Sequence, residues 1–369
     1  YLSYLCAQAI DFNQSFSFDS NHSTFKVFSD SSDSLNYILS NMADEKHIKK
    51  NGIIVVTNNK GKFQNLIKLG KNNNYILSGI KTKNGDFLFI GYSKSNNDEW
   101  NQIYVVKTNH DLDVIWENSY GVLNTDSKGY SIVELNEQEY WLLGHTKTSK
   151  NGALILKIDG NGNEKWFSYL PKLKCNFANN MTVLNDKEFI LSGQNSNQLF
   201  ASKINNKGKI LWQYNYINDK KYHRAYDIKK TDDGGIIIVG NSTKTKDYSY
   251  DILLIKLSKN GQEEWIKTFG NGTNEVAYDI EQNKNLDYII SGYALVDKKE
   301  KKYDSFIIKT DSLGNKIKRL DLNLKQSNQL YDINIKYNQE TKTEFYIGTG
   351  NIFNEFGKSE IWLIKTNID

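Results

Sequence analysis

Three acidic residues recur in one local pattern and are the strongest candidates for chemistry in this sequence. Asp227, Asp279 and Asp332 each follow a tyrosine and precede an isoleucine. They are separated by about fifty residues, so a repeating fold would place the three carboxylates at one level on neighbouring units. Carboxylate oxygens suit a cation such as Ca²⁺, or a basic side chain. Alternatively, each carboxylate accepts a backbone N–H bond from the next unit and satisfies a buried donor.

No other set of residues has the spacing of a catalytic or metal site. The histidines fall in separate segments with no shared spacing, at His22, His47, His110, His145 and His223. Zinc sites and nucleophilic triads require several such groups in a defined arrangement. We therefore predict no catalytic residue and no organic cofactor, leave the metal content unknown with calcium as one candidate, and favour a binding protein over an enzyme.

A repeat of about fifty residues organises the chain. Residues 78–121 align without a gap with residues 227–270, and the segments between them share the pattern. Each unit has an apolar run ending in glycine, an apolar run ending in lysine, and in four units a tryptophan nine residues after that lysine. The glycine position is filled by Asn41, Gly91, Gly144, Gly193, Gly240, Gly292 and Gly348, and the lysine position by Lys107, Lys157, Lys203, Lys256, Lys309 and Lys365.

One unit reads as a four-stranded antiparallel meander with strands at residues 224–230, 236–241, 251–257 and 263–269. Asp-Asp-Gly and Lys-Asn-Gly supply the positive φ of tight hairpins. The run from Ile236 to Val239 is continuously apolar, so both faces of the sheet must be covered. Seven such sheets packed around an axis meet this need, and we predict an all-β, seven-bladed β-propeller forming a single domain over residues 10–369.

The last unit stops one strand short, which predicts how the ring closes. Residues 13–19 precede the first unit where an outer strand is expected, and we assign them as the fourth strand of the last blade. The repeated tryptophans are interpreted as wedges between blades, each contributing up to about 5 kcal/mol. These wedge residues are Trp116, Trp166, Trp212 and Trp265.

The amino-terminal residues predict export. Residues 1–9 form an apolar tail followed by Ala7-Gln8-Ala9, the form of a signal-peptidase site, and are interpreted as a signal-peptide remnant. Cys6 is a candidate for lipidation in a competing reading. The expected location is therefore periplasmic, secreted, or on the cell surface as a lipoprotein. After cleavage only Cys175 remains, so no internal disulfide is expected.

Loop lengths single out one face of the predicted ring as the binding surface. Connections between the second and third strand of each unit are longer than the hairpin turns, and all emerge on the same side. They carry aromatic residues of the kind favoured at interfaces, namely Trp100, Tyr248, Tyr250, Phe353 and Phe356. The net charge of +4 is too small to indicate nucleic acid. We expect a monomer without a transmembrane segment that binds a protein or an envelope polymer.

Residues 224–270 resemble a family of bacterial and archaeal propeller repeats found in secreted proteins and lipoproteins. The shared features are the Asp-Asp-Gly-Gly turn, the apolar run to Gly240, and the lysine and Trp265 of the second hairpin. The resemblance covers nearly the whole chain after residue 9. It implies the fold, export and a binding role, but no particular activity.

A second resemblance is to the tryptophan-docking motif of quinoprotein-type propellers. Residues 158–166 and 257–265 are similar to it, each ending in tryptophan. That group includes quinone-dependent dehydrogenases and an eight-bladed outer-membrane assembly lipoprotein. The chain departs from the dehydrogenases because it lacks a vicinal cysteine pair and is one blade short. The alternative function is thus an enzyme at the axial funnel, either a quinone-dependent oxidoreductase or a glycan-active hydrolase or lyase.

Overall fold

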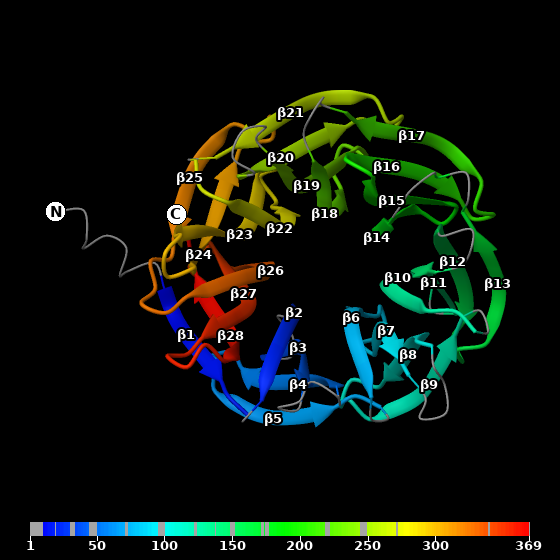
Figure 1. The fold of residues 1–369 in the computed structure, drawn as a ribbon, viewed down its shortest axis with the longest axis horizontal. Coiled ribbons are helices and arrows are strands. Elements are labelled where there is room, and N and C mark those ends of the chain that lie inside the picture. The colour runs from blue at the N-terminus through cyan, green and yellow to red at the C-terminus, as the bar shows by residue number, and fades with distance from the viewer. Residues whose placement is uncertain are drawn as a thin grey trace.

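Seven four-stranded antiparallel sheets surround a central axis in the computed structural model (Figure 1). The structure describes residues 10–18, 20–29, 34–43, 50–70, 73–94, 100–121, 124–136, 138–147, 152–170, 173, 177–217, 222–243, 249–270, 272–338 and 340–368. The predicted seven-bladed β-propeller is confirmed. Within these residues, no helix has the length and apolar character needed to cross a bilayer.

The strands of a blade follow one another along the chain from the axis outward. Blade 1 comprises β2 (Asn21–Ser29), β3 (Leu35–Ala43), β4 (Lys50–Asn58) and β5 (Phe63–Lys68). Blade 2 comprises β6 (Asn74–Lys81), β7 (Phe87–Ser93), β8 (Gln102–Thr108) and β9 (Val114–Tyr120). Blade 3 comprises β10 (Ser127–Asn136), β11 (Glu139–Thr146), β12 (Gly152–Asp159) and β13 (Glu164–Tyr169). Blade 4 comprises β14 (Phe177–Asn185), β15 (Glu188–Asn195), β16 (Gln198–Asn205) and β17 (Ile210–Tyr216). Blade 5 comprises β18 (His223–Lys230), β19 (Ile236–Thr243), β20 (Tyr250–Leu257) and β21 (Glu263–Phe269). Blade 6 comprises β22 (Glu275–Gln282), β23 (Tyr288–Asp297), β24 (Lys302–Thr310) and β25 (Lys316–Asp321). Blade 7 comprises β26 (Asn328–Asn338), β27 (Thr343–Phe353), β28 (Ser359–Thr366) and, outermost, β1 (Ile10–Phe16).

The ring closes as the sequence predicted, through an amino-terminal strand that completes blade 7. β1 pairs antiparallel with β28, and the indole Nε1 of Trp362 donates to Asn13 Oδ1 at 2.6 Å. Lys365 also pairs with Asp11 at 2.8 Å. The strand covers residues 10–16 instead of the predicted 13–19. Phe12 lies opposite Lys365, in the place that tryptophan takes in other blades, so the outer-strand signal was hidden by a different residue.

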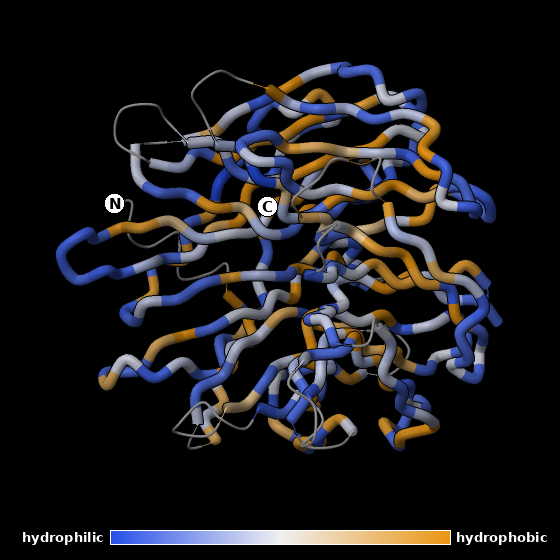
Figure 2. The backbone as a smooth tube through the Cα atoms, turned by 45° about the vertical axis from the view of Figure 1, so that its right-hand side comes forward, coloured by the Kyte–Doolittle hydropathy of each residue, from blue (hydrophilic) through white to orange (hydrophobic). Residues whose placement is uncertain are grey.

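Apolar residues on both faces of each sheet hold neighbouring blades together. Ile237 and Val239 of blade 5, for example, share a buried cluster with Ile290 and Phe306 of blade 6. Figure 2 shows hydrophobic stretches running through the stacked strands, while hydrophilic residues gather at the turns. Hydrophobic burial between blades therefore stabilises the ring, as the continuous apolar runs required.

The repeat tryptophans lie between blades, on the turn of the next outer hairpin. Trp116 donates from Nε1 to Gly160 O at 3.0 Å and covers Gly162, while Trp265 covers Gly314. Their side chains are only half-buried, however. Among the tryptophans of the described part, the fully buried ones are Trp141 and Trp362, so the sequence identified the recurring contact but not the most buried indoles.

The repeated glycine faces a β-bulge on the innermost strand. In blade 5 the bulge lies between Ala225 and Asp227, and Gly240 pairs with Ala225. In blade 7 the equivalent residue is Gly350, opposite Leu330, and in blade 1 it is Ser40, opposite Thr24. The predicted positions Gly348 and Asn41 are therefore wrong by two residues and one residue, because the bulge shifts the register in a way that the sequence does not reveal.

Several predictions concern residues outside the described part of the chain. These are the signal-peptide remnant at residues 1–9 with Cys6, and also His47, Cys175 and Tyr248. Export, lipidation and the redox state of the cysteine therefore stay predictions.

Candidate functional site

The innermost strands of the seven blades line an axial cavity of about 550 Å³. Each of these strands carries a one-residue bulge at the same level. A bulge changes the direction of the side chains beside it. The bulged residue and its successor both line the cavity in every blade, and so form two layers along the axis.

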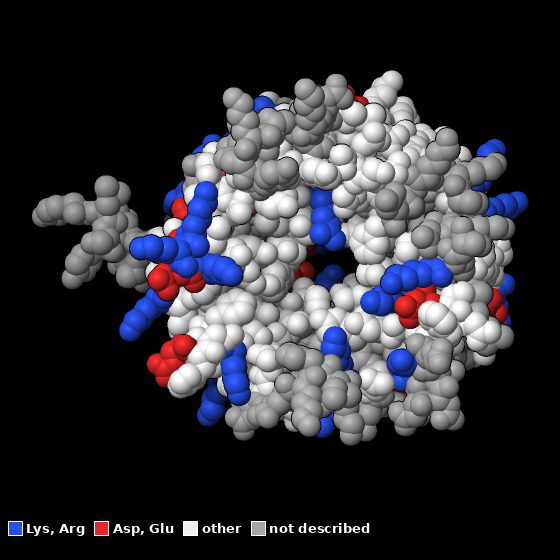
Figure 3. Space-filling view, in the orientation of Figure 1, with Lys and Arg blue, Asp and Glu red and all other residues white. Residues whose placement is uncertain are grey.

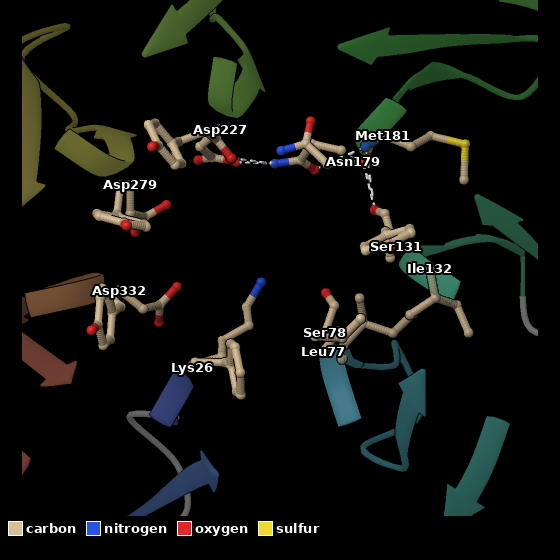
Figure 4. Close-up of a pocket in the computed structure, with 18 of the residues that line it drawn as sticks. Lys26, Leu77, Ser78, Ser131, Ile132, Asn179, Met181, Asp227, Asp279 and Asp332 are labelled. Atoms are coloured by element: carbon tan, nitrogen blue, oxygen red, sulfur yellow. Dashed lines mark hydrogen bonds between the residues drawn. The ribbon is translucent and has the colours of Figure 1, made fainter. Parts of the chain in front are cut away.

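The deeper layer contains the three predicted aspartates. From blade 1 to blade 7 its residues are Lys26, Ser78, Ser131, Asn180, Asp227, Asp279 and Asp332. Figure 4 shows the aspartates on one side of the cavity, with Lys26 and the serines on the other. The structure thus brings the three carboxylates together at one level, as expected from their spacing.

Two of the three carboxylates bind the backbone of the next blade. Asp279 Oδ2 accepts the N–H of Ile333 at 3.0 Å, and Asp332 Oδ2 accepts the N–H of Val27 at 2.9 Å. The structural interpretation of the repeated aspartate is therefore confirmed for these two residues.

Asp227 differs from the other two aspartates. Its Oδ1 accepts a hydrogen bond from Asn180 Nδ2 at 2.5 Å, but no hydrogen bond from the described residues reaches Oδ2. Lys229 Nζ lies 3.5 Å from that oxygen. The residue is only 8% exposed, so a buried carboxylate oxygen lines the cavity with a long ion-pair contact as its main partner.

A half-buried lysine, Lys229, lies between the carboxylates, whose pKa values shift in opposite directions. Lys229 Nζ lies 2.7 Å from Glu281 and 3.5 Å from Asp279; burial opposes its charge, but the carboxylates raise its pKa. Burial, opposed by Lys229, raises the pKa of Asp227 to about 7. Burial and the neighbouring Asp279 raise the pKa of Asp332. Burial also acts against the charge of Asp279, but Lys229 and the other donors hold its pKa below the usual value. Near neutral pH this layer therefore holds protons that a cation could displace.

The upper layer is aromatic on the acidic side. Tyr226, Tyr278 and Tyr331 occupy the bulge positions directly before the aspartates. The ring centroids of Tyr226 and Tyr278 are 4.5 Å apart, and those of Tyr278 and Tyr331 are 5.0 Å apart. Tyr293 stacks on Tyr278 at 5.5 Å. The tyrosine preceding each aspartate in the sequence was a usable signal for this layer, but no role was predicted for it.

Basic side chains surround the mouth of the cavity on the loop-rich face. Arg224 lies 5.3 Å from the Tyr226 ring centroid, and Lys128 lies 4.4 Å from that of Tyr92. Figure 3 shows Lys and Arg atoms around the central opening and acidic atoms deeper inside it. The mouth of the channel is therefore basic, whereas the layer below the tyrosines contains carboxylates together with Lys26 and Lys229.

Two further cavities extend this channel across the loop-rich face. One of about 310 Å³ shares Ser23 and Tyr75 with the axial cavity. A second cavity of about 810 Å³ lies between the loops of blades 6 and 7, and it shares Phe353 and Gly357 with the cavity of about 310 Å³. The three cavities therefore lie next to one another from the rim to the axis, and we call them together the recess of blades 6, 7 and 1.

The predicted interface aromatics do not form one patch. Phe353 lines the recess, and Phe356 stands beside it with 81% of its surface exposed. Trp100 is 40% exposed on blade 2, and Tyr250 is half-buried at the start of β20. The sequence therefore identified one residue of the recess, Phe353. Others, such as Tyr303, come together from loops distant in the sequence.

Among the described residues, no group of three or more His, Cys, Asp or Glu side chains is placed to hold a metal ion. His22 and His223 are buried, and burial lowers the pKa of His22 to about 4. The ring of His223 packs against that of Tyr216, with the ring centroids 4.6 Å apart.

The fold and site define the chain as a seven-bladed propeller with a lined axial cavity, and solved structures share this fold. The β-propeller domain of the Trilobed protease from Pyrococcus furiosus is 10% identical, with a TM-score of 0.51 and 96% of each chain covered. The BP39L lectin of Burkholderia pseudomallei is 5% identical, with a TM-score of 0.61, covering 95% of this chain and 99% of the lectin. YCF48, solved bound to D1 peptide, is 11% identical, with a TM-score of 0.54, covering 98% and 97%.

These likenesses show the fold alone. No family model matches the chain, and no curated protein matches its sequence. The neighbours include a domain of an enzyme and two propellers named for binding, so function must be inferred from the site.

Proposed function

We propose that this protein is a binding scaffold that holds an extended segment of a partner protein in the recess of blades 6, 7 and 1. The observation that supports the proposal is the row of three neighbouring cavities, which share lining residues from the rim to the axis. An extended chain can follow such a path, whereas a compact small molecule would fill only one of the cavities.

The lining of the recess favours a peptide over a uniformly charged polymer. Between blades 6 and 7 it carries both acidic and basic side chains, including Glu300, Lys301, Lys325 and Glu355. Tyr303 and Phe353 add aromatic surface for anchoring side chains. The peptide seen with YCF48 is consistent with this role for the fold. An envelope polymer is the competing ligand, which the experiment below distinguishes.

Selection of random peptides on the purified domain should yield binders that depend on the recess. We expect Phe353→Ala and Tyr303→Ala each to weaken the selected peptide by about tenfold, because each removes an aromatic anchor. Trp100→Ala is the matched control, since it removes an exposed aromatic on the same face outside the recess, and it should leave the affinity unchanged. Affinity would be measured by fluorescence anisotropy.

Two results would contradict the proposal. If Trp100→Ala weakened binding as much as Phe353→Ala, the ligand would bind elsewhere on the face. If peptides gave no binder while a glycan array gave ligands sensitive to Phe353→Ala, the recess would hold a polymer and the protein-segment ligand would be wrong.

One observation favours a second candidate function, a glycan-active enzyme at the axial funnel. Asp227 and Asp279 line the same cavity; burial raises the pKa of Asp227 to about 7, while Lys229 and its other donors keep that of Asp279 low, and such a pair can divide general acid and base roles. This candidate predicts product release from a polysaccharide panel that disappears in both Asp227→Asn and Asp279→Asn. Absence of turnover on every polysaccharide would leave binding as the function.

A further inference from the structure

We infer that the axial cavity receives one basic side chain of the bound segment, a lysine ammonium or an arginine guanidinium, beside Asp227. This inference rests on the proposed function, because the cavity joins the recess through Ser23 and Tyr75. At about 550 Å³ the cavity accommodates a long side chain but no folded element. The ligand would thus lie across the face and insert one residue along the axis.

One carboxylate oxygen of this layer, Asp227 Oδ2, accepts no hydrogen bond from the described residues. Asp227 lines the cavity, and among those residues its buried Oδ2 has only the long contact with Lys229 Nζ at 3.5 Å. The neighbouring carboxylates already accept backbone N–H bonds from Ile333 and Val27. Among the three carboxylates, Asp227 is therefore the one that an entering N–H donor could bind without displacing a backbone hydrogen bond.

The tyrosines above the carboxylates favour an organic cation. Tyr226, Tyr278 and Tyr331 line the same side of the cavity as the aspartates, and aromatic faces attract ammonium and guanidinium groups. A metal ion fits the layer less well, because no three acidic groups in the described residues are arranged as its ligands. A lysine or arginine side chain would use both layers, the stem against the rings and the charge beside Asp227.

If a cation binds beside Asp227, its affinity should also depend on pH. The groups that act on Asp227 are Lys229 on its own strand, Asn180 on β14, and Asp279 and Glu281 on β22. Asp332 on β26 and Lys26 on β2 line the same cavity and act on Asp279 or on each other. Because burial raises the pKa of Asp227 to about 7, an entering cation binds the ionised form and releases a proton. Affinity should therefore rise with pH, by about tenfold between pH 6 and pH 8 for this single group.

Lys26 is the internal competitor for the same site. It enters the cavity from blade 1, between Asp332 and Ser78, and its ammonium points toward the axis (Figure 4). Its positive charge acts on Asp279 and Asp332. Removing this charge should make the cavity more attractive to an external cation, so one substitution on each side of the cavity is expected to change affinity in opposite directions.

The test measures binding of Nα-acetyl-lysine methylamide and of spermidine to the full chain by titration calorimetry. We expect Asp227→Asn to weaken binding by about tenfold and Lys26→Gln to strengthen it several-fold. Ser78→Ala, at the same level on blade 2, is the control and should change nothing. Titrations in two buffers of different ionisation enthalpy would measure the released proton. Melting temperatures would confirm that each variant is folded.

Each outcome decides the inference. Tighter binding of spermidine than of the lysine derivative would support an organic cation and identify a free polyamine as its source. Binding of neither cation, equal binding of Nα-acetyl-glutamine methylamide, or weakening by Lys26→Gln would overturn it. Calcium alone binding through Asp227 would also overturn it in favour of a metal site. Phe353→Ala should weaken the selected peptide but not the small cation, so the proposed function can fail separately.

Discussion

Replacing Gly240 with alanine is expected to lower the free energy of unfolding by about 3 kcal/mol or to prevent folding. The bulge on β18 pushes the carbonyl oxygen of Arg224 toward Gly240, where an added Cβ would lie 1.9 Å from it. The obstacle is backbone, so it cannot rotate away. The same arrangement recurs at other blades, for example at Gly91 against Tyr75 O, also at 1.9 Å.

The control for this prediction is Gly234→Ala in the adjacent hairpin. Gly234 has a φ of +80° and no atom near its added Cβ, so alanine there costs only the left-handed conformation, about 1 to 2 kcal/mol. Urea unfolding followed by tryptophan fluorescence would compare the two variants. Similar losses in both would show that conformation, not the bulge, explains why glycine repeats.

Replacing Trp362 with alanine is expected to lower the free energy of unfolding by about 3 to 5 kcal/mol. The indole is fully buried in the cluster that joins blades 6 and 7, and its Nε1 binds Asn13 on the closing strand. The substitution therefore leaves a cavity and removes a hydrogen bond at the place where the ring closes. Chemical denaturation and limited proteolysis near residues 10–16 would both detect it.

The comparison that tests this assignment is Trp212→Ala. Trp212 is half-buried, and within the described residues its Nε1 has no hydrogen-bond partner. We expect Trp212→Ala to lower the free energy of unfolding clearly less than Trp362→Ala does. The reverse order would mean that the repeated outer tryptophans dominate stability, as the sequence alone had suggested.

The sequence predicted the blades because their signals are local. Hairpin turns, apolar runs and the lysine opposite tryptophan all lie within one unit, so Gly261 and Trp265 could be placed by spacing. The closing strand was assigned to the correct blade, but its bounds were displaced because Phe12 replaces the tryptophan. Gly350 was missed because β27 contains two glycines, and only the opposing bulge distinguishes them.

The site was predictable only where it repeats. The level of the three aspartates followed from the repeat, but the difference between Asp227 and Asp332 depends on Asn180 and Lys229 from particular blades. The recess combines loops of blades 6, 7 and 1, whose residues are far apart in the chain. The spacing of residues within one repeat carries no information about contacts between loops of different blades. The recess could therefore be identified only in the structure.

The seam between β1 and β28 also has a consequence for the order of folding. Asn13 and Trp362 are 349 residues apart, whereas the other blades are made from consecutive strands. Local hairpins form early, and contacts between distant segments form slowly because chain entropy opposes them. The seam should therefore be the last structure to form during synthesis, after the final strand has left the ribosome. Until then, the edge of β28 is exposed and can pair with a foreign strand.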